Sequence, residues 1–280
     1  MKIFSLLTAL EAPREIGLRV QLGRRVTEAS DQEREQLGRL LAKHGVINLV
    51  QQPLSPKELF QFVARWGEVI TLPPGLALSN PEPGFPSITR VGNMRPDGTI
   101  IPSMKFAEYW HHDGDFWMPG ENFIVNFLSC VHVPERGGNT GFLDTRLAYQ
   151  LLGEAERTKY AHAHIWVRAS EISDFKKAAA HELPPDACHP VCLPHPFTQE
   201  PALYLPDSRT GIQAADETEI CRVDPLVESI VQRLGFYEHT WTPGDLVLMD
   251  NLQVMHRGMG GYGDSPRLLY RCQARLRAEG

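Results

Sequence analysis

The residues best suited to chemistry stand together in the segment Trp110-His111-His112-Asp113-Gly114-Asp115-Phe116-Trp117. His111 and Asp113 are two positions apart, and on a β-strand this spacing sends both side chains to one face. An imidazole beside a carboxylate, joined by a second imidazole from elsewhere, forms the set that holds non-haem Fe(II) and leaves positions open for other ligands. Alone, the pattern also fits a surface turn with incidental polar residues, so it requires support from elsewhere in the chain.

Support comes from the C-terminal part of the chain. His256 follows the apolar run Leu246–Met249, which predicts a buried strand. From Arg267 to Arg277 apolar residues occupy the even positions, which predicts a strand with one polar face. Arg267 and Arg271 then point the same way, roughly 13 Å apart at about 3.3 Å per residue. On this pattern alone, the polar face could equally be exposed to solvent.

Several stretches, taken in order, resemble the Fe(II)/2-oxoglutarate-dependent oxygenases of the TauD/TfdA (taurine dioxygenase, clavaminate synthase-like) superfamily. The resemblance runs from about residue 30 to 277 and is more specific than any one motif. Its stretches are Gly45-Val46 through Trp66-Gly67-Glu68, Trp110–Asp113, Gly137-Gly138-Asn139-Thr140 into Phe142–Arg146, His189-Pro190-Val191, His195-Pro196, Ala202–Tyr204, and Trp241–Val247 through His256, Arg267 and Arg271.

The resemblance implies a mainly β fold with flanking α-helices, a double-stranded β-helix or jelly roll. It also implies that His111, Asp113 and His256 are the iron ligands. Thr140 and Arg267 would hold the distal carboxylate of 2-oxoglutarate, because arginine offers a carboxylate a rigid two-pronged donor. Arg271 would meet an anionic substrate. The implied reaction uses Fe(II), 2-oxoglutarate and O2, releases succinate and CO2, and oxidises a small molecule, with hydroxylation as the leading expectation.

The substrate is expected to be a small anionic or amino-acid-derived molecule, with a role in secondary metabolism. Taurine itself is disfavoured, because Val69–Pro73 lacks the family's substrate histidine and Ala107–Tyr109 lacks its asparagine. Asp113 disfavours halogenation, since halogenating relatives replace that carboxylate. Desaturation, cyclisation and oxidative cleavage stay open, because they share the first hydrogen abstraction. A non-catalytic jelly roll binding a metal or small molecule, and a hydrolase without any G-x-S-x-G elbow, are the weaker alternatives.

The neighbours of the predicted site are assigned separately. His112 alternates away from the ligand face and is expected to pack in the interior. Asp115 is expected either to orient a ligand or to meet solvent. The aromatic neighbours are expected to lie in the core: Trp110, Phe116 and Trp117. One of them is expected to line the substrate pocket, and Trp117 is assigned to it. His189 and His195 are expected to be structural, and Arg275 and Arg277 to lie on the surface.

The rest of the chain positions this site. Ser30 and Ser55 each begin a capping box that predicts a helix, and further helices are expected over Leu143–Leu152 and Pro225–Leu234. Strands are expected over Ile3–Leu10, Val46–Val50, Ser87–Val91, Phe123–Leu128 and His164–Val167. The Ile3–Leu10 run imitates a signal peptide weakly, but a strand is favoured. No linker divides residues 1–280, so one domain is expected, and the Pro- and Gly-rich segment 70–108 is a candidate lid.

Composition limits the partners. Lys plus Arg is 28 and Asp plus Glu is 34, a net charge of −6, which argues against a nucleic-acid partner that needs a basic surface. No run is long enough for a transmembrane helix, so no membrane partner is expected. Five cysteines without a framework indicate a reducing, cytoplasmic location rather than disulfides. Cys188 and Cys192 lack the second pair of a zinc site. Homo-oligomerisation stays open.

Overall fold

The computed structural model describes residues 7–11, 16–72, 80–101, 107–121, 123–172, 183–206, 210–216 and 218–276. Its largest sheet has nine strands in the order β1-β2-β3-β16-β7-β18-β6-β5, with β4 paired to β18. All the pairings are antiparallel except that of β2 with β3. The strands are β1 (Leu7–Glu11), β2 (Leu18–Leu22), β3 (Val46–Val50), β4 (Glu68–Val69), β5 (Pro81–Glu82), β6 (Phe85–Gly92), β7 (Ile124–His132), β16 (Leu246–Asp250) and β18 (Leu268–Arg275).

A smaller sheet faces the large one and completes a jelly-roll core, as predicted. It comprises β15 (Tyr237–His239), β8 (Thr140–Asp144) and β17 (Val254–Gly258), in that order. A β-bridge between His111 and His256 extends it by one position. Because strand residues alternate between faces, Phe142 and Val254 point toward the large sheet and join a core with Leu128 and Val247.

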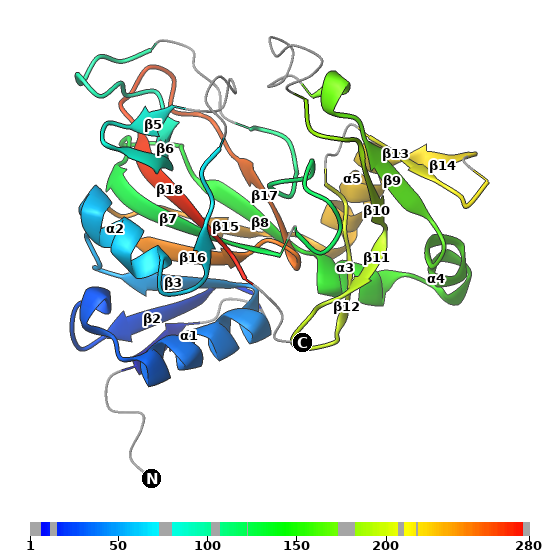
Figure 1. Ribbon diagram of the computed structural model, residues 1–280, viewed down its shortest axis with the longest axis horizontal. Helices are drawn as coiled ribbons and strands as arrows, with labels where there is room; N and C mark the ends of the chain where they lie inside the picture. Colours follow the sequence, from blue (N-terminus) through cyan, green and yellow to red (C-terminus); the bar gives the residue numbers. More distant parts are fainter. Residues whose placement is uncertain are drawn as a thin grey trace.

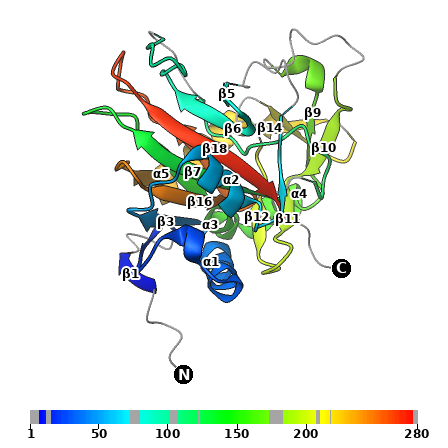
Figure 2. The same ribbon diagram turned by 60° about the vertical axis from the view of Figure 1, so that its left-hand side comes forward.

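Two helices cover the outer face of the large sheet (Figure 2). α1 (Asp31–His44) and α2 (Pro56–Val63) begin at the predicted capping boxes of Ser30 and Ser55. Gly45, which ends α1, has a φ of +66°, a left-handed conformation that favours glycine. Apolar residues of both helices pack against the even-numbered residues of β18 and against β3 and β16. Both faces of β18 are therefore buried, and its polar face points inward.

A block of chain between β8 and β15 forms a separate layer beside the jelly roll, at the right of Figure 1. It leaves after Asp144 and returns at Tyr237, which pairs with Phe142 on β8. The core of this block also takes in Leu143 and Met255 from the outer face of the small sheet. Its elements are α3 (Thr145–Leu151), α4 (Glu154–Tyr160), β9 (His164–Val167), η2 (Ala169–Glu171), β10 (Ala187–Pro190), β11 (Cys192–Pro194), β12 (Pro201–Leu203), β13 (Gly211–Gln213), β14 (Glu219–Arg222) and α5 (Val223–Leu234); η1 (Val26–Glu28) lies before α1.

Some predicted boundaries shift. The helix predicted over Leu143–Leu152 begins only at Thr145, because Leu143 and Asp144 belong to β8 and the Asp144 carboxylate caps the helix. The strand predicted over Ile3–Leu10 is present as β1 where it is described, while residues 1–6 lie outside the described residues. The candidate lid 70–108 contributes β6 to the large sheet; residues 73–79 and 102–106 lie outside the described part, and a lid role stays a prediction.

Within the described stretches, no helix is long and apolar enough to cross a membrane.

Candidate active site

The three predicted ligands lie close together between the large sheet and the small sheet. Nε2 of His111 lies 3.8 Å from Oδ1 of Asp113, and Nε2 of His256 lies 3.7 Å from Oδ2 of the same carboxylate. One ligand atom from each residue falls within 4.8 Å of the other two, and all three side chains are buried. This is the two-imidazole, one-carboxylate arrangement predicted from the sequence, assembled from segments 145 residues apart in the chain.

Backbone hydrogen bonds fix the three residues relative to one another. The His111 amide donates to the His256 carbonyl (3.1 Å), and the His256 amide donates to the His111 carbonyl (2.9 Å). The chain turns from Asp113 to Phe116, so the His-x-Asp pair is not on a continuous strand. Asn251 holds this turn instead: its Oδ1 accepts from the Asp113 amide and its Nδ2 donates to the Asp113 carbonyl, each at 2.8 Å.

The surroundings of the two imidazoles favour metal binding through a ring nitrogen. Nδ1 of His111 lies 2.9 Å from the Tyr109 carbonyl, a partner that can only accept, so this nitrogen carries the proton. Burial, followed by the neighbouring His111, lowers the pKa of His256 to about 3. A neutral imidazole with a free ring nitrogen is the form that binds a metal ion.

The Asp113 carboxylate accepts hydrogen bonds from three side chains on β7 and β18. Oδ1 accepts from Nη1 of Arg271 (2.9 Å), while Oδ2 accepts from Nδ2 of Asn126 (2.7 Å) and Nε2 of Gln273 (3.2 Å). Burial alone would raise the pKa of Asp113, but Arg271 and the two ligand histidines outweigh it and hold that pKa below its usual range. The carboxylate is therefore charged throughout the neutral range.

Thr140 and Arg267 lie on neighbouring parts of the two sheets. Nε of Arg267 donates to the carbonyl of Gly138 (2.8 Å), two residues before Thr140, and Nη1 donates to the Val91 carbonyl (3.4 Å). The Thr140 hydroxyl accepts from Nε1 of Trp241 (3.0 Å), which leaves its own proton available to donate. Arg267 is only 4% exposed, and no carboxylate of the described residues lies within 4.0 Å of its guanidinium. Burial accordingly lowers its pKa.

Arg271 borders the histidine–carboxylate cluster, whereas Trp117 lies beside the turn that follows Asp113. Nε of Arg271 is buried and has no hydrogen-bond partner in the described structure. The Trp117 amide donates to the Gly114 carbonyl, and the guanidinium carbon of Arg275 lies 4.7 Å from the centre of the Trp117 ring. Arg275, predicted to lie on the surface, is partly exposed: its side chain keeps 18% of its accessible surface, and Nε donates to the Glu121 carbonyl. Arg277 lies outside the described residues.

The other histidines of the region are structural, as predicted. His112 is buried, and its Nδ1 lies 3.1 Å from the carbonyl of Leu205. His189 contacts the backbone carbonyl of Asp115 through Nε2 (2.7 Å). Asp115 lies within the turn and lines a cavity of about 370 Å³ with residues of β9, β13 and β14, so it does not share a strand face with His111.

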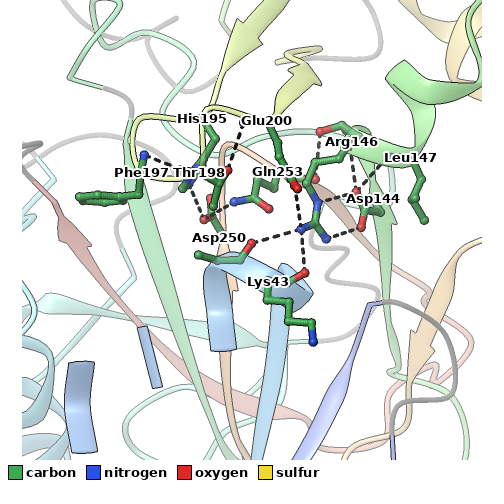
Figure 3. Close-up of polar contacts among 12 residues, drawn as sticks. Lys43, Asp144, Arg146, Leu147, His195, Phe197, Thr198, Glu200, Asp250 and Gln253 are labelled. Carbon is green, nitrogen blue, oxygen red and sulfur yellow. Dashed lines mark hydrogen bonds and ion pairs between the residues drawn. The ribbon is translucent and has the colours of Figure 1, made fainter. Parts of the chain in front are cut away.

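A buried charged network supports the turn that carries Asn251 and leads to His256 (Figure 3). The His195 Nδ1 accepts from two backbone amides, so its Nε2 carries the proton and donates to Oδ2 of Asp250 (2.9 Å). Gln253 donates to the same oxygen (3.0 Å). On the other side of the network, Arg146 makes a two-pronged ion pair with Asp144, with a closest distance of 2.6 Å, and donates to the carbonyl of Lys43 at the end of α1 (2.8 Å).

Sequence reasoning missed three residues that hold Asp113, namely Asn126, Asn251 and Gln273. A signal existed for two of them. Asn126 interrupts the apolar run of β7, and Gln273 lies on the polar face of β18 two residues after Arg271. A polar side chain within a buried strand needs a hydrogen-bond partner inside the protein. Such a residue is therefore a candidate for contact with a buried polar site. Asn251 lies in a turn, where asparagine is common, and carried no comparable signal.

The donor set fits a divalent metal ion with open coordination positions. Two imidazoles and one charged carboxylate match the facial triad of non-haem iron sites, and no thiolate takes part. Among the described residues, no second cluster of potential ligands of this kind occurs. Cys188 and Cys192 form no disulfide, and Nε2 of His189 between them contacts the Asp115 carbonyl.

Comparison with known proteins supports the same conclusion. The model of the "Taurine catabolism dioxygenase TauD, TfdA family" matches residues 9–273. The chain is 28% identical to an α-ketoglutarate-dependent 2,4-dichlorophenoxyacetate dioxygenase of Cupriavidus pinatubonensis, covering 87% of this chain and 86% of the relative. It is also 28% identical to a tyrosine isonitrile desaturase of Erwinia amylovora, covering 72% and 66%.

A solved structure shows the same fold. The structure of AAD-2 in complex with Mn(II) and N-oxalylglycine superimposes with a TM-score of 0.78 at 21% identity, covering 96% of this chain and 97% of the other. The family match spans nearly the whole chain and includes all three predicted ligands. The protein therefore belongs to the TauD/TfdA family and is a 2-oxoglutarate-dependent dioxygenase that uses a metal ion.

Proposed function

We propose that the metal is Fe(II), held by His111, Asp113 and His256, and that the enzyme uses O2 to oxidise a small organic carboxylate. The observation that carries the metal assignment is the buried cluster of two imidazoles and one charged carboxylate within 4.8 Å. When bound, Fe(II) with 2-oxoglutarate and O2 supplies the oxidation, with release of succinate and CO2. The protein holds the ligands, positions both organic substrates and excludes water.

Arg267 and Thr140 are the proposed partners of the distal carboxylate of 2-oxoglutarate. A buried guanidinium without a carboxylate partner among the described residues is costly unless a bound anion matches its charge. Thr140 keeps a hydroxyl proton to donate, because its oxygen accepts from Trp241. An arginine and a hydroxyl together match the acceptors that a carboxylate offers.

The substrate class rests on Arg271 and Trp117. Nη1 of Arg271 is bonded to Asp113, while its Nε lacks a partner, so this cation can meet an anionic group close to the metal. Trp117 offers an aromatic surface beside the same turn. The Cupriavidus relative is named for an aryl ether carboxylate, which agrees with this chemistry. Hydroxylation is the leading reaction, and the Erwinia desaturase keeps desaturation as the second candidate.

A substrate panel tests the proposal. Purified protein with Fe(II), 2-oxoglutarate and O2 is offered aryloxy carboxylates, amino acids and their derivatives, and succinate release is measured beside the substrate's mass. A gain of one oxygen supports hydroxylation, and a loss of two hydrogens supports desaturation. The His256→Ala variant serves as the control without metal. Succinate release that is equal in wild type and His256→Ala would refute the assigned site, and turnover only of uncharged compounds would refute the carboxylate class.

Three further assignments complete the proposal. The chain forms one oxygenase domain over 1–280, with 70–108 as a lid over the site. It acts in the cytoplasm, supported by five cysteines that form no disulfide. It has no nucleic-acid partner, supported by the net charge of −6.

A further inference from the structure

We infer that Gln273 and Asn126 form an amide relay that positions Asp113 as a metal ligand. The inference rests on the proposed metal site and adds two residues to it. Both belong to the large sheet, where Gln273 on β18 pairs directly with Asn126 on β7. Both side chains point into the space between the sheets and are at most 7% exposed. Their amide side chains are not among the three proposed metal ligands. Gln273 and Asn126 therefore act on the metal only through the Asp113 carboxylate that they contact.

The hydrogen bonds run in one direction, from Gln273 to Asn126 to Asp113. Nε2 of Gln273 donates to Oδ1 of Asn126 (2.6 Å) and also to Oδ2 of Asp113 (3.2 Å). An amide nitrogen has two protons, so it can make both bonds at once. Because Oδ1 of Asn126 is engaged by Gln273, its Nδ2 has to face Asp113, to which it donates at 2.7 Å. Gln273 therefore sets the orientation of Asn126 as well as contacting the carboxylate itself.

The two amides distinguish the oxygens of Asp113. Oδ2 accepts two hydrogen bonds, one from each amide, and these occupy its two lone pairs. Oδ1 accepts one hydrogen bond, from Arg271, and keeps a lone pair. The relay therefore directs Oδ1 to the metal and stops the carboxylate from rotating about its Cβ–Cγ bond. Partners of this kind fix ligand orientation, and their loss typically weakens metal binding by about 10- to 100-fold.

The relay is tested by measuring metal affinity directly, without turnover. Mn(II) binding is titrated by electron paramagnetic resonance for wild type, Gln273→Met and Asn126→Leu, which keep approximate size and remove the amide. Each variant is expected to bind Mn(II) about tenfold more weakly. The double variant should lose less than the product of the two single losses, because Gln273 acts partly through Asn126. The visible spectrum of the Co(II)-loaded variants should also shift from that of wild type, because the carboxylate geometry changes.

Matched controls separate this role from general damage to the fold. Gln52 is another buried glutamine, bonded to the Val26 amide and away from the ligands. Gln52→Met should lower the stability of the protein while leaving Mn(II) affinity within twofold of wild type. Should Gln273→Met fail to fold, Asn126→Ser tests the same link from the other strand. Folded variants of Gln273 and Asn126 with wild-type Mn(II) affinity and Co(II) spectrum would overturn the relay. Failure of wild type itself to bind Mn(II), or wild-type affinity in His256→Ala, would instead refute the proposed metal site.

Discussion

Replacement of Arg267 by methionine should separate the stability of the protein from its affinity for 2-oxoglutarate. Arg267 is 4% exposed, and no carboxylate of the described residues pairs with it. Its replacement removes an unpaired buried charge, which is unfavourable in the interior. It also leaves the Gly138 carbonyl without the hydrogen bond that Nε of Arg267 donates at 2.8 Å. An unsatisfied buried group costs about 1–3 kcal/mol, and removal of the unpaired charge offsets this. The free energy of unfolding should therefore change by less than about 2 kcal/mol.

The loss in affinity should be much larger. Removing one partner of a buried hydrogen-bonded charge pair costs about 2–5 kcal/mol, which corresponds to a roughly 30-fold to several-thousand-fold weaker complex. Calorimetric titration of the Mn(II)-loaded protein with N-oxalylglycine, an unreactive analogue of 2-oxoglutarate, measures this term. Urea denaturation of the metal-free protein measures the stability.

Arg146 is the matched control, because it is equally buried but is paired with Asp144. Arg146→Met leaves the Asp144 carboxylate buried and uncompensated, and it should lower stability by about 3–5 kcal/mol. Its folded fraction should bind N-oxalylglycine within a few-fold of wild type. The reasoning about Arg267 would be refuted if Arg267→Met destabilised the protein as much as Arg146→Met and retained N-oxalylglycine affinity.

Three further outcomes are expected. Asn251→Asp retains an acceptor for the Asp113 amide but places a carboxylate oxygen against the Asp113 carbonyl. The affinity for Mn(II) should therefore fall at least tenfold. Unchanged affinity would show that the turn at Asp113 keeps its geometry without Asn251. Arg271→Met should raise the KM for the carboxylate substrate at least tenfold in steady-state kinetics, and it should leave the calorimetric affinity for N-oxalylglycine within a few-fold of wild type. An unchanged KM with weakened N-oxalylglycine binding would exclude Arg271 as the residue that binds the substrate carboxylate. Burial lowers the pKa of His112 to about 3, so the unfolded chain takes up a proton below about pH 6.5 that the folded protein refuses. The contribution of His112 to the free energy of unfolding is therefore complete above that pH and should fall by about 1.4 kcal/mol per pH unit between pH 6.5 and pH 3. Denaturation of His112→Asn across pH 5–7.5 should show a free energy of unfolding that depends less steeply on pH than in wild type. An unchanged dependence would contradict the assignment.

Sequence patterns predicted the elements that depend on local chemistry. The capping boxes at Ser30 and Ser55 located α1 and α2, because these side chains satisfy amides of the first turn wherever the helix lies. The alternation of β18 was also correct, but the burial of both its faces could not be known, since α1 and α2 cover the apolar face from distant parts of the sequence. The contact of Arg275 with Trp117 could not be predicted for the same reason, because Trp117 comes from another segment.

The cluster of His111, Asp113 and His256 could be predicted because its residue types are rare in combination and their order resembles a known family. Their supports could not be predicted in the same way. Asn251 acts on Asp113 across 138 positions and Gln273 across 160, so neither contact leaves a trace in local spacing. The geometry that supported the His-x-Asp pair was also different from the prediction: a turn held by Asn251 brings Asp113 to the cluster, whereas a strand was expected.

The return of β15 beside β8 has a consequence for how such an enzyme can diversify. The block from Thr145 to Phe236 leaves and re-enters the small sheet at paired strands, so its two ends are neighbours. Segments with adjacent ends can be lengthened, shortened or exchanged without breaking the pairing of the strands that anchor them. His111, Asp113, His256 and Arg267 all lie outside this block, while residues of β9, β13 and β14 share a cavity with Asp115. The scaffold thus allows the walls of that cavity to change within one block of the chain, while the strand pairing around the cluster of His111, Asp113 and His256 is kept.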